Sequence, residues 1–296
     1  MSRTSAITDS RWMRLKARLA DYVLLVKFRL SFTVVFSAGI GYMFAGGDIA
    51  YFSLFLLAGF LITGASNALN EILETNSDKL MSRTAVRPLP AGRMQAGEAI
   101  LASGFMGVIG ILLMWIFFSP LAALLGAISL LTYSFIYTPL KKVSPIAVWV
   151  GAFPGAMPPL IGWAAATGEI GTMAVLLFTI QFMWQFPHFW SIAWVAFEDY
   201  AKADLYLLPA STGRDKRSAV QVVLYTVLLI GVSTLPFLLG YTGIVSLIIT
   251  LAAGLLFLLQ AIRLWQTCSD KMARQLMFGS FLYLPVVLIA LFADKM

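Results

Sequence analysis

Nine long apolar stretches follow one another along the chain, separated by short polar segments. A helix that crosses a membrane needs about 20 mostly apolar residues. The stretches reach this length without the alternation of apolar and polar residues that marks a transmembrane β-strand. The pattern predicts an all-α polytopic membrane protein with nine transmembrane helices in a single transmembrane domain over residues 1–296. The predicted spans are roughly 23–45, 51–70, 99–118, 120–138, 146–166, 172–194, 218–240, 243–262 and 275–293.

The composition agrees with this pattern. Of the 296 residues, 60% are hydrophobic and 12% are charged, whereas soluble domains have about 45–50% apolar and about 25% charged residues. A disordered protein, a coiled coil and almost any soluble enzyme are therefore excluded. Because the chain has one cysteine, Cys268, and one histidine, His188, an intramolecular disulfide, a cysteine-based metal cluster and a multi-histidine site are excluded as well.

The basic residues predict the topology. Almost all of the 21 Lys and Arg lie in the N-terminal tail and in every second connection between spans, while the other connections are short and nearly uncharged. Lys and Arg collect on the cytoplasmic side of a membrane. We therefore expect a cytoplasmic tail over residues 1–21 and, with an odd number of spans, a C-terminus outside. The net charge of +7 then reflects contact with a lipid bilayer and needs no nucleic acid.

The connection after the second span begins with side chains that are costly in a membrane. Asn70, Glu74 and Asp78 are spaced four residues apart, on one face of a helix, with Glu71 beside them. Oxygen ligands at such a place suit a hard cation such as Mg²⁺. The alternative is a solvated helix end with ordinary ion pairs, which does not explain polar side chains where the apolar span still continues.

Two arginines follow these acids directly. Arg83 and Arg87 are again four residues apart and are closed off by two prolines. Carboxylates that hold a metal, followed by guanidinium groups that bind phosphate oxygens in pairs, suit a phosphate-bearing ligand. The first predicted active-site loop is therefore the segment of about 70–97.

The connection after the sixth span, about 197–217, contains a second acidic group that includes Asp199 and Asp204. It is predicted to lie on the same side of the membrane as the first loop, so the two groups can face each other across a diphosphate held by Mg²⁺. Asp199 and Asp204 are five residues apart, about 140° around a helix, and cannot share a face of a regular helix. An ordinary charged cytoplasmic loop is the alternative.

Aromatic and basic residues near the same membrane surface have two interpretations. His188 lies among aromatic residues near the end of the sixth span, and Tyr133, Tyr137, Lys141 and Lys142 end the fourth. All five fit plain interface anchors. The functional alternatives are an iron ligand or proton carrier for His188 and a phosphate-facing edge for the others.

The fifth span contains Pro154, Pro158 and Pro159. Prolines break backbone hydrogen bonds and are tolerated in a membrane beside other helices or a cavity. We expect them to line a cavity. Gly151 and Gly155, four residues apart, are expected to allow close packing.

Several of these motifs resemble a known family. NEILETNSD, starting at Asn70, is similar to the first aspartate-rich motif of the intramembrane prenyltransferases of the UbiA superfamily, with Glu at two of the usual Asp positions. LMSRTAVRPL from Leu80, AVWVGAFPGAMPPLIGW from Ala147, and FPHFW followed by EDY and LLP resemble its haem branch, the protohaem IX farnesyltransferases. The second acidic loop departs from the superfamily's DxxxD spacing, so Asp204 matches less well than Asp199.

The resemblance implies a cavity that faces the cytoplasm, in the bacterial inner membrane. Farnesyl diphosphate is expected to bind there and to transfer its farnesyl group to a vinyl group of haem b, which gives haem O. A haem A synthase or an oxidase-assembly protein is the implied partner. The implied Mg²⁺ ligands and catalytic residues are Asn70, Glu74, Asp78 and Asp199, and the implied substrate-binding residues are Arg83, Arg87, Lys141, Lys142, Tyr133, Tyr137, His188 and Asp204.

Two other functions compete. One is a prenyltransferase of the same superfamily that acts on an aromatic or quinone precursor, from which the RTxxRPL and PHFW elements distinguish the haem branch. The other is a transporter that uses the acids as an ion site. Transport sites lie near the bilayer midplane, whereas these acids lie at the predicted cytoplasmic edge beside arginines, which favours a diphosphate.

Overall fold

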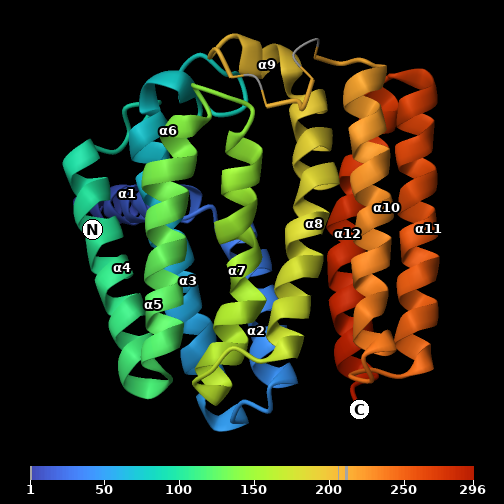
Figure 1. Cartoon of the computed structure of the whole chain (residues 1–296). Coiled ribbons are helices and arrows are strands. Elements are labelled where there is room, and N and C mark those ends of the chain that lie inside the picture. The colour runs from blue at the N-terminus through green and yellow to red at the C-terminus, as the bar shows by residue number, and fades with distance from the viewer. Residues whose placement is uncertain (1, 206, 211–212) are drawn as a thin grey trace.

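The computed structural model describes residues 2–205, 207–210 and 213–296, with side chains described from residue 12 onward. Long helices run up and down side by side in one bundle (Figure 1). The helices of the described residues are α1 (Ser2–Leu25), α2 (Phe28–Phe44), α3 (Ile49–Asp78), α4 (Ala96–Phe117), α5 (Pro120–Leu131), the π-helix η1 (Thr132–Tyr137), α6 (Thr138–Leu140), α7 (Ala147–Thr167), α8 (Thr172–Val195), α9 (Phe197–Ala201), α10 (Lys216–Leu238), α11 (Ile244–Thr267) and α12 (Asp270–Ala293).

The predicted apolar stretches extend at most two residues beyond the ends of these helices, but the first of them, 23–45, crosses the bend between α1 and α2. In the described part of the chain, α3, α4, the α5–α6 segment, α10, α11 and α12 are long and apolar enough to cross a membrane. The bent pair Trp12–Leu25 and Phe28–Phe44 adds a seventh such segment, whereas α7 and α8 do not reach the same apolarity. The all-helical membrane fold is confirmed, and the count of nine spans and the orientation of the termini stay predictions.

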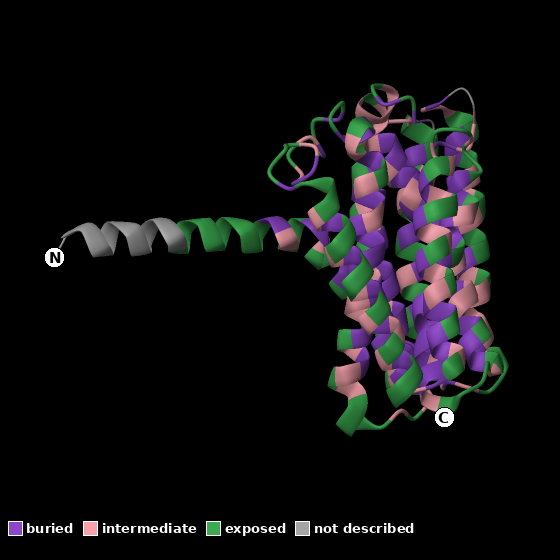
Figure 2. Cartoon of the chain, turned by 90° about the vertical axis from the view of Figure 1, so that its left-hand side faces the viewer, coloured by how far each residue is buried: buried purple, intermediate pink, exposed green. Residues whose placement is uncertain are grey.

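Burial follows the requirements of a lipid solvent. Buried residues are concentrated where helices face one another, and exposed residues are frequent on the outward faces of the helices (Figure 2). Many of the outward side chains are large and apolar, for example Leu101 and Leu256, as a surface in contact with lipid tails requires. Two apolar cores fill the interior, one mainly among α2, α3, α5 and α7, the other mainly among α7, α8, α10, α11 and α12. α7 therefore joins the two halves of the bundle.

α7 stays helical through its prolines because neighbouring helices satisfy the carbonyls that the prolines leave free. Pro159 has no N–H for the carbonyl of Gly155 one turn earlier. Gln181 Nε2 on α8 donates to that carbonyl at 2.8 Å. Ser129 Oγ on α5 donates in the same way to the carbonyl of Pro154 at 3.3 Å. The prolines thus tie α7 to the helices on either side.

The chain bends between α1 and α2, and α1 runs crosswise to the bundle (Figure 2). The two helices meet at an angle of 50°, and Lys27 at the bend has φ = 48°, a left-handed conformation that non-glycine residues seldom adopt. Ion pairs hold α1 to the start of α4, between Arg93 and Asp21 at 2.8 Å and between Arg18 and Glu98 at 2.9 Å.

Candidate active site

α3 carries the predicted acidic face into the polar end of the bundle. The span predicted to end at 70 continues as a helix to Asp78. Asn70, Glu74 and Asp78 lie on one face, as their spacing predicts, and Asn70 Nδ2 donates to Glu74 Oε2 at 2.9 Å. All three side chains are at most 5% exposed, so they are not the solvated helix end of the alternative interpretation.

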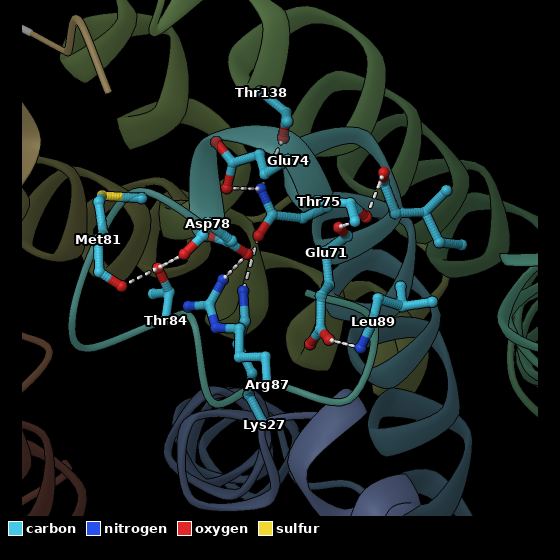
Figure 3. Close-up of polar contacts among 12 residues, drawn as sticks. Lys27, Glu71, Glu74, Thr75, Asp78, Met81, Thr84, Arg87, Leu89 and Thr138 are labelled. Atoms are coloured by element: carbon cyan, nitrogen blue, oxygen red, sulfur yellow. Dashed lines mark hydrogen bonds and ion pairs between the residues drawn. The ribbon is translucent and has the colours of Figure 1, made fainter. Parts of the chain in front are cut away.

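Three cations from three segments contact this face, and Figure 3 shows two of them, Lys27 and Arg87. Lys27 Nζ, at the bend between α1 and α2, donates to Asn70 Oδ1 at 2.7 Å. Lys141, directly after α6, forms an ion pair with Glu74, and Arg87 Nη1 donates to Asp78 Oδ2 at 2.6 Å. We call these six residues the head cluster. Its carboxylates are buried and its cations are partly buried, so removal of one partner would leave an uncompensated charge.

Two carboxylate oxygens at this end of α3 are buried and have no hydrogen-bond partner among the described residues. They are Asp78 Oδ1 and Glu71 Oε2. The other oxygen of Glu71 accepts a hydrogen bond from the backbone N–H of Leu89 at 3.1 Å, so Glu71 holds the loop after α3 against the helix. A buried polar atom without a partner is rare in a folded protein and marks a place for an ion or ligand.

The oxygen-rich face fits a hard cation, which prefers carboxylate and amide oxygens. Asn70, Glu74 and Asp78 supply such oxygens, and Asp78 Oδ1 is unused. Within the described ranges, however, no three His, Cys, Asp or Glu side chains are gathered closely enough to hold a metal by themselves. Lys141 and Arg87 take up carboxylate oxygens instead, so a metal would bind together with a ligand that draws these cations away.

Asp199 brings the second acidic loop to the first. It lies on α9, and its carboxylate accepts hydrogen bonds from the backbone N–H groups of Ser82 at 3.2 Å and Arg83 at 3.3 Å. Lys202 Nζ donates to it at 2.9 Å. The Lys202 ammonium and these two N–H groups hold the pKa of Asp199 below its ordinary value. The two loops are therefore in contact, as predicted. Asp199 of the second loop makes this contact with Ser82 and Arg83 of the first, beside the head cluster.

The remaining predicted polar residues lie farther out. Arg83, Lys142 and Asp204 are exposed. Asp204 follows α9 in a left-handed conformation, with φ = 53°, so it does not share a helix face with Asp199. Of the predicted phosphate-binding residues, the structure therefore brings Arg87 and Lys141 to the acidic face.

A cavity of about 220 Å³ lies between α2, α3, η1, α7 and α8. Its walls are mainly apolar and include Tyr133, Tyr137, Pro154, Pro158 and His188. Pro154 and Pro158 line the cavity as predicted, whereas Pro159 does not line it and packs against Gly41 of α2. The Lys141 ammonium lies 4.9 Å from the centre of the Tyr137 ring, so Tyr137 connects the head cluster to the cavity.

The wide turns of η1 place both tyrosines on the cavity. Their ring centres are 5.4 Å apart, and Thr138 Oγ1, which follows them, donates to the carbonyl of Tyr133 and accepts from Asn70 Nδ2 at 3.0 Å. Short π-helical segments often occur at functional sites. A Cβ on Gly151 would lie 2.6 Å from the Tyr137 ring, so the close packing predicted for this glycine is present and leaves room for the tyrosine.

His188 is 7% exposed and is enclosed by aromatic rings. Its ring is stacked on Trp184, with centres 4.3 Å apart and planes 15° apart, and is edge-on to Phe281 at 5.0 Å. Because it lines the cavity, it is not an anchor at the outer surface of the bundle.

Sequence reasoning missed three residues of this site: Lys27, Thr138 and Ser82. The sequence signal for Lys27 is its position inside the first predicted apolar stretch, 23–45. Thr138 and Ser82 carry no charge and contact residues 68 and 117 positions away, so nothing in the local sequence identifies them.

The sequence is similar to those of known enzymes over nearly its whole length. A protoheme IX farnesyltransferase of Cytophaga hutchinsonii is 52% identical over 93% of this chain and 97% of its own length. One of Flavobacterium johnsoniae is 42% identical over 96% of this chain and 97% of its own length. The chain covers nearly the whole of both relatives.

Solved structures share the fold. One described as digeranylgeranylglyceryl phosphate synthase has a TM-score of 0.78 at 22% identity and covers 94% of this chain and 98% of its own. A UbiA homolog from Archaeoglobus fulgidus bound to GPP and Mg²⁺ has a TM-score of 0.71 at 15% identity and covers 92% and 99%. The model of the UbiA prenyltransferase family matches residues 34–284. Since that match spans most of the sequence, the chain belongs to the UbiA prenyltransferase family.

Proposed function

We propose that this enzyme transfers the farnesyl group of farnesyl diphosphate to a vinyl group of haem b, with release of diphosphate. Water then adds to the carbocation left on the former vinyl group and loses a proton, which gives a hydroxyethylfarnesyl group. The relatives that support this activity are protoheme IX farnesyltransferases over nearly their whole length. The observation that carries the proposal is the position of the head cluster at one end of an apolar cavity, to which Tyr137 connects it. A prenyl diphosphate has the same division into a charged head and an apolar chain.

The head cluster binds the diphosphate by exchanging partners. Phosphate oxygens compete with Glu74 and Asp78 for the cations of Lys141 and Arg87, which are now in ion pairs with them. Guanidinium and ammonium groups stabilise charge that builds up on the leaving group. The carboxylate oxygens released in this exchange, together with Asn70 and with Asp199 of the neighbouring loop, would hold Mg²⁺. Bound Mg²⁺ supplies further charge neutralisation on the phosphate oxygens.

The cavity protects the reacting end of the farnesyl group. Its apolar and aromatic walls exclude water while the carbon–oxygen bond to diphosphate breaks, which leaves the vinyl group of haem b as the nearest nucleophile. A volume of about 220 Å³ is below the range of about 300–1,000 Å³ of small-molecule sites. The wall side chains therefore move apart when both substrates are bound.

The place of the enzyme follows from its substrates and relatives. We propose the cytoplasmic membrane of a bacterium, with the head cluster on the cytoplasmic side, and a haem A synthase or an oxidase-assembly protein as the partner that takes the product. Co-purification of such a protein with the tagged chain from native membranes tests the partner.

A panel of acceptors tests the choice of substrate. The purified enzyme is incubated with radiolabelled farnesyl diphosphate and Mg²⁺, with haem b in one sample and 4-hydroxybenzoate in another. Label is expected in the haem fraction alone. Label on 4-hydroxybenzoate alone would reject the haem reaction and favour a prenyltransferase that acts on an aromatic precursor.

A further inference from the structure

We infer that His188 is the axial ligand of the haem iron in the substrate complex, and that Ser280 on α12 is the positioning residue that presents it. This inference rests on the proposed function, because it specifies how the haem acceptor of that reaction is held. It starts from three contacts in which α8 and α12 fix one imidazole ring.

The first contact determines which ring nitrogen carries the proton. His188 Nδ1 lies 2.7 Å from Ser280 Oγ, and Ser280 Oγ lies 2.6 Å from the carbonyl oxygen of Met277. A carbonyl can only accept, and a serine hydroxyl has a single proton to donate. Ser280 therefore donates to Met277, and it accepts the proton of His188 Nδ1.

The tautomer leaves Nε2 as the nitrogen with a free lone pair. In the described part of the chain no hydrogen bond reaches Nε2, and His188 lines the cavity. A neutral imidazole in this state is the form that binds metals, and the hydrogen bond at the other nitrogen raises its basicity and fixes its orientation.

Two further contacts stop the ring from turning. Trp184 is stacked on one face of the imidazole at 4.3 Å, and its own Nε1 donates to the backbone carbonyl of Ser280 at 2.8 Å. Phe281, the next residue on α12, lies edge-on at 5.0 Å. The same turn of α12 thus holds both the histidine and the tryptophan stacked on it.

Iron is the part of the haem that this nitrogen recognises. Proteins bind haem iron through His, Cys, Met or Tyr, and His188 is the chain's single histidine. The cavity is also lined by Tyr133 and Tyr137, so a tyrosinate ligand is the competing outcome of the test.

The test uses the full chain in detergent with haemin as the probe, without farnesyl diphosphate. Absorption, electron paramagnetic resonance and resonance Raman spectra are recorded for the wild type and for His188→Gly, Ser280→Ala and Ser191→Ala. Ser191 is the matched control, because its hydroxyl donates to the backbone carbonyl of His188 at 2.7 Å and leaves the ring alone.

The wild type is expected to show a histidine-ligated haem. His188→Gly should lose this signature and regain it when imidazole is added to the solution. Ser280→Ala should keep the ligand, lower the iron–histidine stretching frequency of the ferrous form, and weaken haemin binding about 10-fold or more, as loss of a partner behind a ligand does. Ser191→Ala should match the wild type.

Three results would overturn the inference: no haemin binding by the wild type, an unchanged spectrum in His188→Gly, or an unchanged stretching frequency in Ser280→Ala. If His188→Gly does not fold, Ser280→Ala decides alone. Product formation by the wild type, measured in parallel, separates this inference from the proposed function. Product formation without histidine ligation would reject His188 as the iron ligand and leave the proposed function standing. Histidine ligation without product formation would reject the proposed function and leave the ligand standing.

Discussion

Arg87 donates a hydrogen bond of 2.6 Å to one carboxylate oxygen of Asp78, while the other oxygen of Asp78 is buried without a partner among the described residues. Asp78 ends α3, and Arg87 lies in the loop that follows it. At the junction of the helix and the loop, one oxygen of the Asp78 carboxylate is therefore hydrogen-bonded and the other is not. Together with the ion pair of Lys141 and Glu74, this leaves each carboxylate of the head cluster paired with one of its cations, for which the phosphate of the proposed ligand would compete.

The variant Glu74→Gln, compared with a double variant, distinguishes the effect of Glu74 on stability from its effect on catalysis. The change leaves the Lys141 ammonium buried without its carboxylate, and breaking a buried ion pair costs about 3–5 kcal/mol. The double variant Glu74→Gln with Lys141→Met removes both charges and should recover most of that stability. Neither variant should form product, because a metal ligand is missing in both. Thermal unfolding and product formation are measured on the same preparations. Normal turnover in Glu74→Gln would remove this residue from the site.

Gly151→Ala tests the position of Tyr137. The new methyl group would lie 2.6 Å from the Tyr137 ring, and overpacking of this kind costs about 1–3 kcal/mol. We expect a lower melting temperature and a loss of activity, since Tyr137 lines the cavity. Gly104→Ala in α4 is the matched control. No atom lies within 4 Å of its added methyl group, and it should raise stability by up to about 1 kcal/mol. Equal behaviour of the two variants would contradict the packing of Tyr137 against α7.

The ionisation of Asp199 should make the stability of the folded protein depend on pH. Its pKa is held below the ordinary value by Lys202 and by backbone N–H groups, so its contribution is fully present above about pH 4 and is lost as the pH falls further. The difference in melting temperature between the wild type and Asp199→Asn should therefore be constant between pH 5 and pH 8, to within about a degree, and should shrink on acidification. A difference that grows as the pH falls would show that Asp199 is not paired in this way.

The orientation in the membrane is tested with single cysteines. In a Cys268→Ser background, Lys142→Cys and Glu169→Cys place exposed thiols at opposite ends of α7. A membrane-impermeant thiol reagent added to intact cells should label Glu169→Cys alone, and it should label Lys142→Cys only after the cells are opened. Labelling of Lys142→Cys in intact cells would reverse the predicted topology.

The sequence was sufficient for the features that depend on local pattern. Apolar length predicts the helices, and the spacing of Asn70, Glu74 and Asp78 predicts their common face, because a helix converts spacing directly into direction. The pairing of Lys141 with Glu74 depends on how α6 packs near α3, and no periodicity encodes it. The π-helical turns of η1 were not predicted either, since its residues contain no proline or glycine that would signal an irregular turn.

The environment of His188 could not be predicted from the sequence either. Its aromatic neighbours on α8 are visible in the sequence, but its hydrogen-bond partner Ser280 is 92 residues away. A serine in an apolar helix has no signal that distinguishes it from its neighbours. The pattern therefore left an interface anchor and a functional residue equally open, and the packing of α8 against α12 was needed to place the ring at the cavity.

The most direct test of the account is the mass of the product formed by the purified enzyme from haem b and farnesyl diphosphate. With Mg²⁺ present, pigment extracted after incubation should have the mass of haem b plus one farnesyl group and one hydroxyl group. Chelation of the metal, or Asp78→Asn, should leave haem b unchanged. Unmodified haem b in the complete reaction, with an enzyme shown to be folded and to bind farnesyl diphosphate, would contradict the assignment of haem as the acceptor.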